Sequence, residues 1–234
     1  MRFSKRYASK IILAGKERSR QRNIGAKAAR GTWLLFIDAD MEMSGNVIAK
    51  CIEISQDKVT DPVIAISEQS VGTNFWGKAF ALEKNCYKNA TWLHAARFFP
   101  RKAFLKLGGY DEHLFAGEDW DITQRFRLQG FPLFIAKHSF LLHHERNENL
   151  LKLLKKEHYY IQNIDRYATK HPYPFSYQGS FLYRGFIWIR SWNELIRHPL
   201  LTFAFLWYKL MVWLMWMWHK RKPKKGKIQK AKAL

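Results

Sequence analysis

An unbroken run of apolar residues, from Trp33 to Ile37, stops at two carboxylates, Asp38 and Asp40. Apolar residues without alternation are typical of a strand that is covered on both faces, as in a parallel sheet between layers of helices. Ligands of such sheets bind beyond the carboxyl ends of the strands. Side chains spaced i, i+2 on extended chain point to the same side, so the two carboxylates could share a divalent cation. Asp is also common where a strand ends in a turn, so a cap of the following helix is the alternative.

Helical and extended patterns alternate along the first part of the chain. Helices are predicted at 18–30, 44–56, 76–88, 100–107 and 119–129, and short apolar strands at 63–66, 95–99, 131–136 and 139–142. Gly31 and Gly130 would end two of these helices. Alternating strands and helices with short links indicate an α/β domain, which we expect to occupy residues 1–148.

The pattern changes after His144. One long amphipathic helix is predicted from Leu150 to Lys170, an aromatic-rich segment follows at 181–195, and residues 199–218 contain a single charged side chain, Lys209. A segment of about 20 apolar residues can span a bilayer. A lysine near its centre would cost about 3 kcal/mol. We therefore expect residues 149–234 to be a helical membrane-associating region, with either an interfacial helix or a C-terminal transmembrane segment.

Positive charge is concentrated in the same region. The formal net charge is +21; residues 1–150 hold 23 basic and 16 acidic side chains, whereas residues 151–234 hold 17 and 3. Basic, aromatic and apolar residues together favour an anionic membrane surface over nucleic acid as the partner, and no module for reading bases is recognisable. The two cysteines, Cys51 and Cys86, lack metal-binding spacing and favour a reducing compartment. We therefore expect the chain at the cytoplasmic face of the cell membrane.

Three motifs occur in an order that resembles glycosyltransferase family 2. They are Arg22-Asn23-Ile24-Gly25 leading to the Asp38-Ala39-Asp40 element, Gly108-Gly109-Tyr110-Asp111-Glu112 followed by Glu118-Asp119-Trp120-Asp121, and His143-His144-Glu145 at a strand end. The Asp38-Ala39-Asp40 element is similar to the metal-binding Asp-x-Asp motif of that family. The resemblance covers roughly residues 18–145. It implies a GT-A-like fold, a mixed α/β sheet flanked by helices.

The resemblance also implies a metal-dependent, inverting transferase of the hexosyltransferase type. Such an enzyme moves a sugar from a nucleotide-diphosphate donor to a lipid-linked or cell-surface glycan acceptor. By resemblance, Asp40 would ligate Mn²⁺ or Mg²⁺, and Asp38 would contact the metal or the nucleotide ribose. Arg22 and Asn23 would touch the donor diphosphate or nucleotide, with a solvated helix face as the alternative.

Further roles follow from the same resemblance. Glu42 and either His144 or His143 would complete the metal coordination, unless the histidines are ordinary strand-end residues. Asp119 and Glu118 would be the catalytic carboxylates, with Asp119 as the base that deprotonates the acceptor hydroxyl and a helix N-terminal cap as the other interpretation of Asp119. Two tryptophans, Trp76 and Trp120, would stack on sugar or acceptor, or belong to the core.

The chain departs from the family pattern at its beginning. Family 2 domains begin with a strand, a helix and a second strand that build the nucleotide-base pocket, whereas this sequence begins shortly before the Arg22 helix. We therefore expect an N-terminally incomplete domain that misses its first strands, which another polypeptide could supply. Two other functions stay open: a catalytically inactive remnant or scaffold subunit at the membrane surface, and a basic nucleic-acid or phospholipid binder without chemistry.

Overall fold

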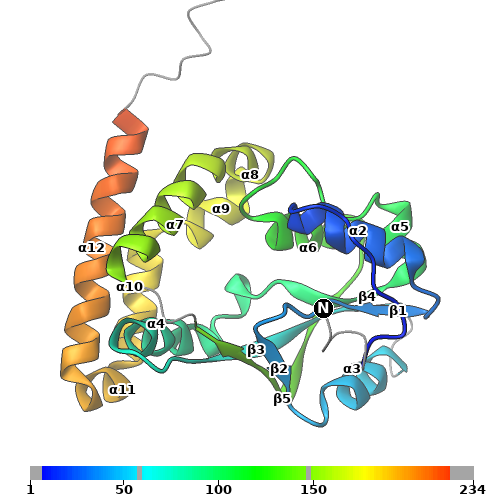
Figure 1. The fold of residues 1–234 in the computed structure, drawn as a ribbon, viewed down its shortest axis with the longest axis horizontal. Helices are drawn as coiled ribbons and strands as arrows, with labels where there is room; N and C mark the ends of the chain where they lie inside the picture. Colours follow the sequence, from blue (N-terminus) through cyan, green and yellow to red (C-terminus); the bar gives the residue numbers. More distant parts are fainter. Residues whose placement is uncertain (1–6, 57–59, 146–148, 222–234) are drawn as a thin grey trace, which may run out of the picture.

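The computed structural model describes residues 7–56, 60–145 and 149–221. Within these residues a five-stranded mixed sheet forms the centre, in the order β1-β4-β3-β5-β2 (Figure 1). The strands are β1 (Trp33–Leu35), β2 (Met41–Met43), β3 (Val63–Val71), β4 (Ala96–Pro100) and β5 (Leu133–His144). Strands β3 and β5 are parallel, and the other neighbouring pairs are antiparallel. A mixed sheet flanked by helices confirms the expected fold class.

Helices cover both faces of the sheet. On one face lie α2 (Arg18–Ala28), α5 (Arg101–Lys106) and α6 (Glu118–Leu128), which share a buried core that includes Phe99, Phe104 and Ile122. On the other face, Val47 and Cys51 of α3 (Val47–Gln56) pack against the sheet. The helices and strands predicted in the first 130 residues all form close to their expected positions.

Strand β1 shows where the apolar run of the sequence goes. Leu34 is buried in the core beneath α2, whereas Trp33 and Leu35 pack into the core beneath α3, which confirms that the strand is covered on both faces. Its partner is β4, and the pairing is antiparallel. Burial on both faces requires helical layers and does not depend on strand direction, so an apolar run alone cannot distinguish the two pairings.

Two strands predicted at 131–136 and 139–142 form one strand, β5. Its pairing with β3 shifts between Ile66 and Ser67, whose partners are Ala136 and Phe140. The intervening His138 has a φ of 61°, which is the left-handed region. This irregularity re-aims the end of β5, where His143 and His144 lie. Strand β2, which pairs with that end, was not predicted, because Met41-Glu42-Met43 contains no apolar run.

The C-terminal part is helical, as expected, but more finely divided. It contains α7 (Leu150–Asn163), α8 (Asp165–Lys170), α9 (Pro172–Gln178), α10 (Phe181–Arg190), α11 (Trp192–Arg197) and α12 (Pro199–Arg221). The helix predicted at 150–170 is interrupted at Ile164, and the segment at 181–195 is interrupted at Ser191. Helix α12 runs along α4 (Phe75–Cys86) and α7 at one edge of the molecule (Figure 1).

A third core joins these helices to the first part of the chain. Cys86 of α4, Trp188 of α10 and Phe205 of α12 are buried together, and Trp76 packs beside them. Lys209, the charge inside the apolar segment, reaches Glu83 of α4 with 2.9 Å between Nζ and Oε2. Because both side chains are buried or nearly so, the pair fixes the rotation of α12 about its own axis.

Candidate active site

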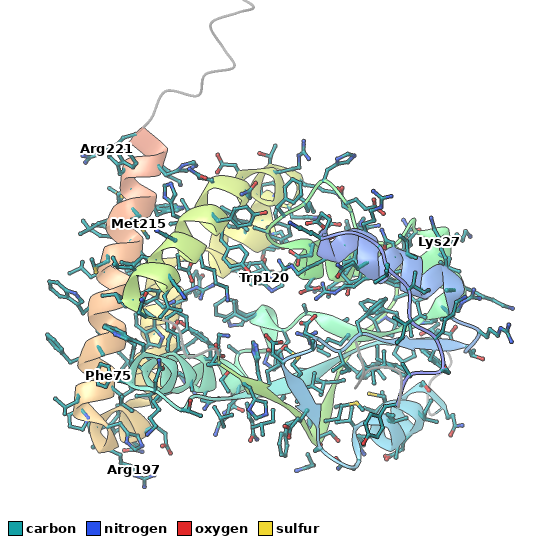
Figure 2. The ribbon with its side chains drawn as sticks, in the orientation of Figure 1. Lys27, Phe75, Trp120, Arg197, Met215 and Arg221 are labelled. Atoms are coloured by element: carbon teal, nitrogen blue, oxygen red, sulfur yellow. The ribbon has the colours of Figure 1, made fainter. Side chains whose placement is uncertain are left out.

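A cavity of about 960 Å³ lies between the sheet and the C-terminal helices. One end is lined by Arg97, Glu118 and Asp119, and the other by side chains of α4, α10 and α12. Trp120 also lines it and lies between the sheet and the C-terminal helices (Figure 2). Its indole Nε1 donates a hydrogen bond of 2.9 Å to the carbonyl oxygen of Leu93, so this side chain is fixed at the cavity wall.

Arg22 joins two of the predicted motifs. Its Nη2 donates to Oδ1 of Asp38 and its Nη1 to Oδ1 of Asp119, both at 2.7 Å. Burial lowers the pKa of the Arg22 guanidinium, but the charges of Asp119 and Asp38 more than offset this and raise the pKa. The guanidinium is therefore a positively charged bridge between the end of β1 and the beginning of α6.

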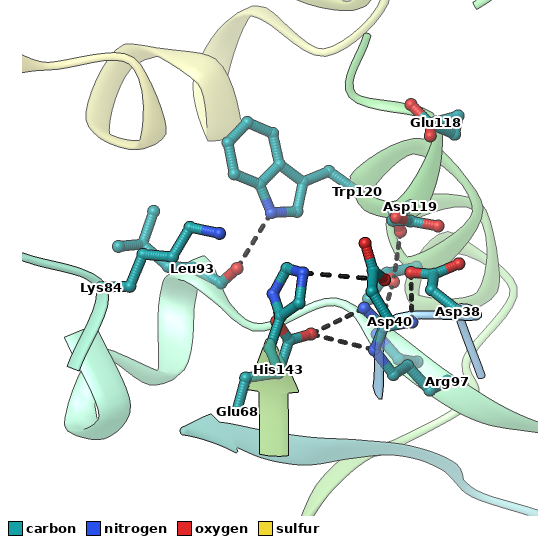
Figure 3. Close-up of polar contacts among 12 residues, drawn as sticks. Asp38, Asp40, Glu68, Lys84, Leu93, Arg97, Glu118, Asp119, Trp120 and His143 are labelled. Carbon is teal, nitrogen blue, oxygen red and sulfur yellow. Dashed lines mark hydrogen bonds and ion pairs between the residues drawn. The ribbon is translucent and has the colours of Figure 1, made fainter. Parts of the chain in front are cut away.

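Asp38 is held by a second guanidinium. Nη1 of Arg97 lies 3.3 Å from its Oδ2, and the same arginine donates to Oε1 of Glu68, with 2.7 Å from Nη2. Burial raises the pKa of Asp38, but Arg22 and Arg97 outweigh burial and keep that pKa below its usual value. Both carboxylate oxygens of Asp38 thus accept from arginines (Figure 3).

Asp40 faces a different partner. Its Oδ1 lies 3.7 Å from Nε2 of His143, while Nδ1 of this histidine is 3.8 Å from Glu68 and 3.6 Å from Glu145 (Figure 3). That Nδ1 is buried without a hydrogen-bond partner within the described structure. His143, which is the alternative to His144, therefore lies beside Asp40.

The other two predicted metal ligands lie elsewhere. Glu42 and His144 contact each other at 2.9 Å, and both are exposed, with 69% and 47% of their side chains accessible. Successive side chains of a strand point to opposite faces, so His144 points away from the side of β5 that carries His143. The structure therefore pairs the side chains of Glu42 and His144 and does not bring them to the Asp40 carboxylate, although the backbone N–H of His144 donates to the Asp40 carbonyl oxygen at 2.9 Å.

These contacts limit how a metal could be held. In the described parts of the chain, no group of three or more His, Cys, Asp or Glu side chains is arranged to hold an ion. Asp40 and His143 are the pair that fits a divalent cation, because Asp38 is already occupied by two arginines. Mg²⁺ is commonly held by one or two carboxylates with phosphate oxygens as the remainder, and Asp40 is the carboxylate of this pair.

The two carboxylates at the start of α6 differ in their surroundings. Gly117 adopts a φ of 78° before the helix, so the chain turns sharply and α6 begins at Glu118. Glu118 is buried and lies 3.0 Å from Arg18, whereas 32% of the Asp119 side chain is accessible. Burial and the neighbouring Asp119 raise the pKa of Glu118. Asp119 is therefore the carboxylate better placed to meet a substrate in the cavity.

Asn23 has a position apart from this cavity. Its Nδ2 donates to the carbonyl oxygen of Tyr110 at 2.9 Å and its Oδ1 accepts from the backbone N–H of the same residue at 2.8 Å. A Cβ at Gly109, whose φ is 70°, would lie 2.4 Å from that Oδ1. Asn23 thus holds the loop of the second motif against α2, and its predicted contact with the donor stays a prediction.

Sequence reasoning missed Arg97 and Glu68. Arg97 is the single charge in an apolar strand, with Ala96 before it and two phenylalanines after it. Glu68 follows the apolar part of β3. A lone charge within a buried strand requires a partner. That signal could have identified both residues, whereas their meeting with Asp38 depends on the pairing of β4 with β1 and β3.

Comparison with known proteins gives one family match and several similar relatives. Residues 6–112 match the family model described as "Glycosyl transferase family 2". Two similar relatives, from Mycobacterium bovis (strain BCG / Pasteur 1173P2) and Mycobacterium tuberculosis (strain ATCC 25177 / H37Ra), carry the name "PGL/p-HBAD biosynthesis glycosyltransferase". Each is 30% identical over 105 residues, which are 44% of this chain and 41% of the relative. The chain thus matches less than half the length of these relatives. The family match contains Arg22, Asp38 and Asp40, and ends before Asp119.

Proposed function

We propose that this chain, a member of glycosyltransferase family 2 through residues 6–112, transfers a sugar from a nucleotide-diphosphate donor to an acceptor hydroxyl. The observation that supports this proposal best is the Arg22 bridge. It places Asp119, which lines the cavity, next to the Asp38-Ala39-Asp40 element, although the two are far apart in the sequence. A base and a site for the leaving diphosphate are needed side by side in this chemistry.

The proposed reaction is a single displacement. Asp119 accepts the proton of the acceptor hydroxyl while the oxygen forms a bond to the anomeric carbon of the sugar. The bond from that carbon to the diphosphate oxygen breaks, and its electron pair leaves with the nucleoside diphosphate, so the configuration inverts. Arg22 and Arg97 would offset the negative charge near the leaving group, and they keep Asp38 ionised and in place.

Asp40 and His143 would hold the divalent cation of this proposal. When bound, the cation would neutralise the diphosphate as the sugar leaves. The donor phosphates would supply the other ligands, as Mg²⁺ and related ions accept.

Release of nucleoside diphosphate tests the activity. The full chain is incubated with a panel of nucleotide-diphosphate sugars and MnCl₂ or MgCl₂, with Asp119→Asn as the control. We expect metal-dependent release with at least one donor, and a loss of about 10²- to 10⁴-fold in Asp119→Asn, which is the usual contribution of a general base.

Donor binding without release in any combination would favour the second candidate, a scaffold subunit. That candidate is supported by the occupation of Asp38 by two arginines.

Helix α12 supports a membrane-surface location for this activity. Within the described residues it is the one helix long and apolar enough to cross a membrane, with 23 residues and a mean hydropathy of 1.5. Its neighbours α4 and α7 carry several charged side chains, including Lys84, Lys152 and Lys156, which a bilayer core would not accept. We therefore propose that α12 lies in the headgroup layer of a cytoplasmic membrane face, where Arg197 and Arg221 would meet anionic lipids.

A further inference from the structure

The cavity changes in polarity along its length. Arg97 and Glu118 line it together with Asp119, and Tyr87, Gln178 and Arg184 add further polar side chains. The C-terminal helices supply its apolar lining, with Val212, Trp213 and Trp216 of α12 and Phe181 and Leu182 of α10, next to the paired charges Lys209 and Glu83 and to Lys220. A ligand that fills this space would therefore need a polar end near Asp119 and an apolar end between α10 and α12.

Residues at the apolar end also belong to the molecular surface. Leu182 is 84% exposed, Phe181 43% and Trp213 37%, although all three line the cavity. The rings of Phe181 and Trp213 contact each other, with centroids 6.4 Å apart. These side chains form a mouth where the cavity meets the outside of the α10–α12 hairpin.

The mouth continues into a larger apolar surface. On α12 the exposed residues Phe203, Leu210 and Leu214 are spaced as one helical stripe, and on α10 the exposed residues Leu182, Phe186 and Ile189 form another. Exposed apolar surface of this extent marks a contact with a membrane or a protein. The bordering Arg190, Arg197 and Lys220 favour an anionic membrane.

The inner stripe of α12 is fixed independently of that surface. Lys209, Val212 and Trp216 follow one another at i, i+3 and i+7, and all three line the cavity. The ion pair between Lys209 and the buried Glu83 holds this stripe inward. Tyr87 reinforces the contact, because its hydroxyl donates to Glu83 at 2.6 Å and accepts from Nε1 of Trp188 at 2.9 Å. The apolar end of the cavity is therefore a built wall, set by buried polar contacts.

From this polarity gradient we propose that the acceptor is an amphiphile that stays in the membrane during the reaction. Its apolar tail leaves the cavity through the mouth formed by Phe181 and Trp213, and its polar end reaches Asp119. This inference rests on the proposed glycosyl transfer and specifies its acceptor class. The bonds that form and break are those given above, with the acceptor hydroxyl at the polar end of the amphiphile.

Photolabelling without donor tests the tail site separately from catalysis. The probe is dodecyl phosphate with a diazirine at the end of its chain, added to the full chain in the absence of vesicles. We expect saturable labelling of the segments that contain Phe181 and Trp213. Unlabelled dodecyl phosphate and dodecanol should suppress it, whereas glycerol phosphate, which has no long tail, should not. Labelling confined to the outer stripe, or labelling that does not saturate, would overturn the inference.

Two substitutions on α12 provide a matched pair. Val212→Glu places a carboxylate on the cavity wall, and Leu214→Glu places the same group on the outer stripe. Labelling at the mouth should fall at least 10-fold in Val212→Glu and persist in Leu214→Glu. If Val212→Glu fails to fold, Trp216→Ala replaces it, with an expected loss of the same sign. Equal labelling in the inner and outer variants would contradict a tail site in the cavity.

Turnover then separates this inference from the proposed function. With an active donor, kcat/KM should be at least 10-fold higher for an alkyl-tailed acceptor than for its tail-less analogue. Equal values would refute the membrane amphiphile and leave the transferase proposal intact. Labelling at the mouth without transfer from any donor would refute the transferase and leave an amphiphile-binding site.

Discussion

Arg22 is the residue on which the candidate active site depends most. A single guanidinium contacts carboxylates from two motifs, and only a planar group with two separated donors can do this. Lysine keeps the charge but offers one compact ammonium. We therefore expect Arg22→Lys to lower kcat by about 10²-fold, a range typical of lost positioning, while the chain stays folded.

Arg20 provides the control for this prediction, since it lies exposed on the same helix. Arg20→Lys should have unchanged kcat and KM. Steady-state kinetics with the active donor and thermal unfolding of each variant are the measurements. An Arg22→Lys enzyme with full kcat would show that the bridge between the two motifs has no part in the reaction.

Substitution of either aspartate of the Asp38-Ala39-Asp40 element is expected to lower activity, but for different reasons. Both carboxylate oxygens of Asp38 accept hydrogen bonds from arginines, whereas Asp40 lies beside His143. In Asp40→Asn, higher MnCl₂ should restore part of the activity, because a weaker ligand raises the metal concentration needed. In Asp38→Asn, added metal should restore nothing, because the lost contacts are those to Arg22 and Arg97. Titration of activity with MnCl₂ measures the difference, and rescue of Asp38→Asn would contradict it.

At this scale the sequence predicted the groups that lie within motifs and missed those that depend on strand pairing. Asp38, Asp40 and Asp119 could be identified because each lies within a short motif of the sequence. Arg97 reaches Asp38 only because β4 lies between β1 and β3, which no local pattern records. The choice between His143 and His144 depended on the phase of β5, and an irregularity at His138 sets that phase.

Between elements, the Glu83–Lys209 pair is the contact that attaches α12 to α4. Both side chains are largely buried, so removing one leaves the other as an unpaired charge, which typically costs about 3–5 kcal/mol. Lys209→Met should therefore lower the free energy of unfolding by about that amount. The double variant Glu83→Gln, Lys209→Met should be less destabilised than Lys209→Met alone, as urea unfolding would show. A larger loss in the double variant would contradict a charge-pair origin.

The same pair predicts that the free energy of unfolding decreases at acidic pH. Burial raises the pKa of Glu83, but Lys209 outweighs it, so the pKa lies below the ordinary value of 4.5. The ionised form is thus favoured by folding, and the stabilisation is present above pH 4.5 and lost as the pH falls through the lowered pKa. In Glu83→Gln this part of the pH dependence should disappear. An unchanged acid limb in urea unfolding at a series of pH values would contradict the assignment.

The predicted ends of helices were wrong where the sequence contains no residue that typically ends a helix. Helix 150–170 was expected to be continuous because its apolar stripe passes through Ile164 without Gly or Pro, yet the structure divides it there into α7 and α8. At the C-terminal end of α8, Asp121 of α6 lies 2.8 Å from both Lys170 and His171. These tertiary contacts hold the end of α8 against α6, and helix propensity alone cannot reveal them.

At the scale of the whole molecule, the sheet and the C-terminal helices line one cavity. This cavity therefore spans the division at residue 148 that we expected from composition. Composition separated the two regions by charge. It could not show that α12 turns Lys209 toward α4 and its apolar stripe outward, because a helix that is apolar on nearly all sides has no preferred face in its sequence.

That outward stripe predicts how the full chain binds membranes. In flotation assays it should bind vesicles with 30% anionic lipid much more strongly than neutral vesicles, and raising NaCl from 0.1 to 0.5 M should release most of it, because the Debye length falls from about 10 Å to less than half of that. Leu214→Glu, on the exposed stripe, should weaken binding, whereas Val212→Glu, on the cavity wall, should leave it nearly unchanged. A chain that stays in the vesicles after carbonate extraction at high pH would instead indicate a transmembrane α12. In that case the Glu83–Lys209 contact and the packing of α12 on α4 would have to break during insertion, since the charged side chains of α4 and α7 cannot follow it into hydrocarbon.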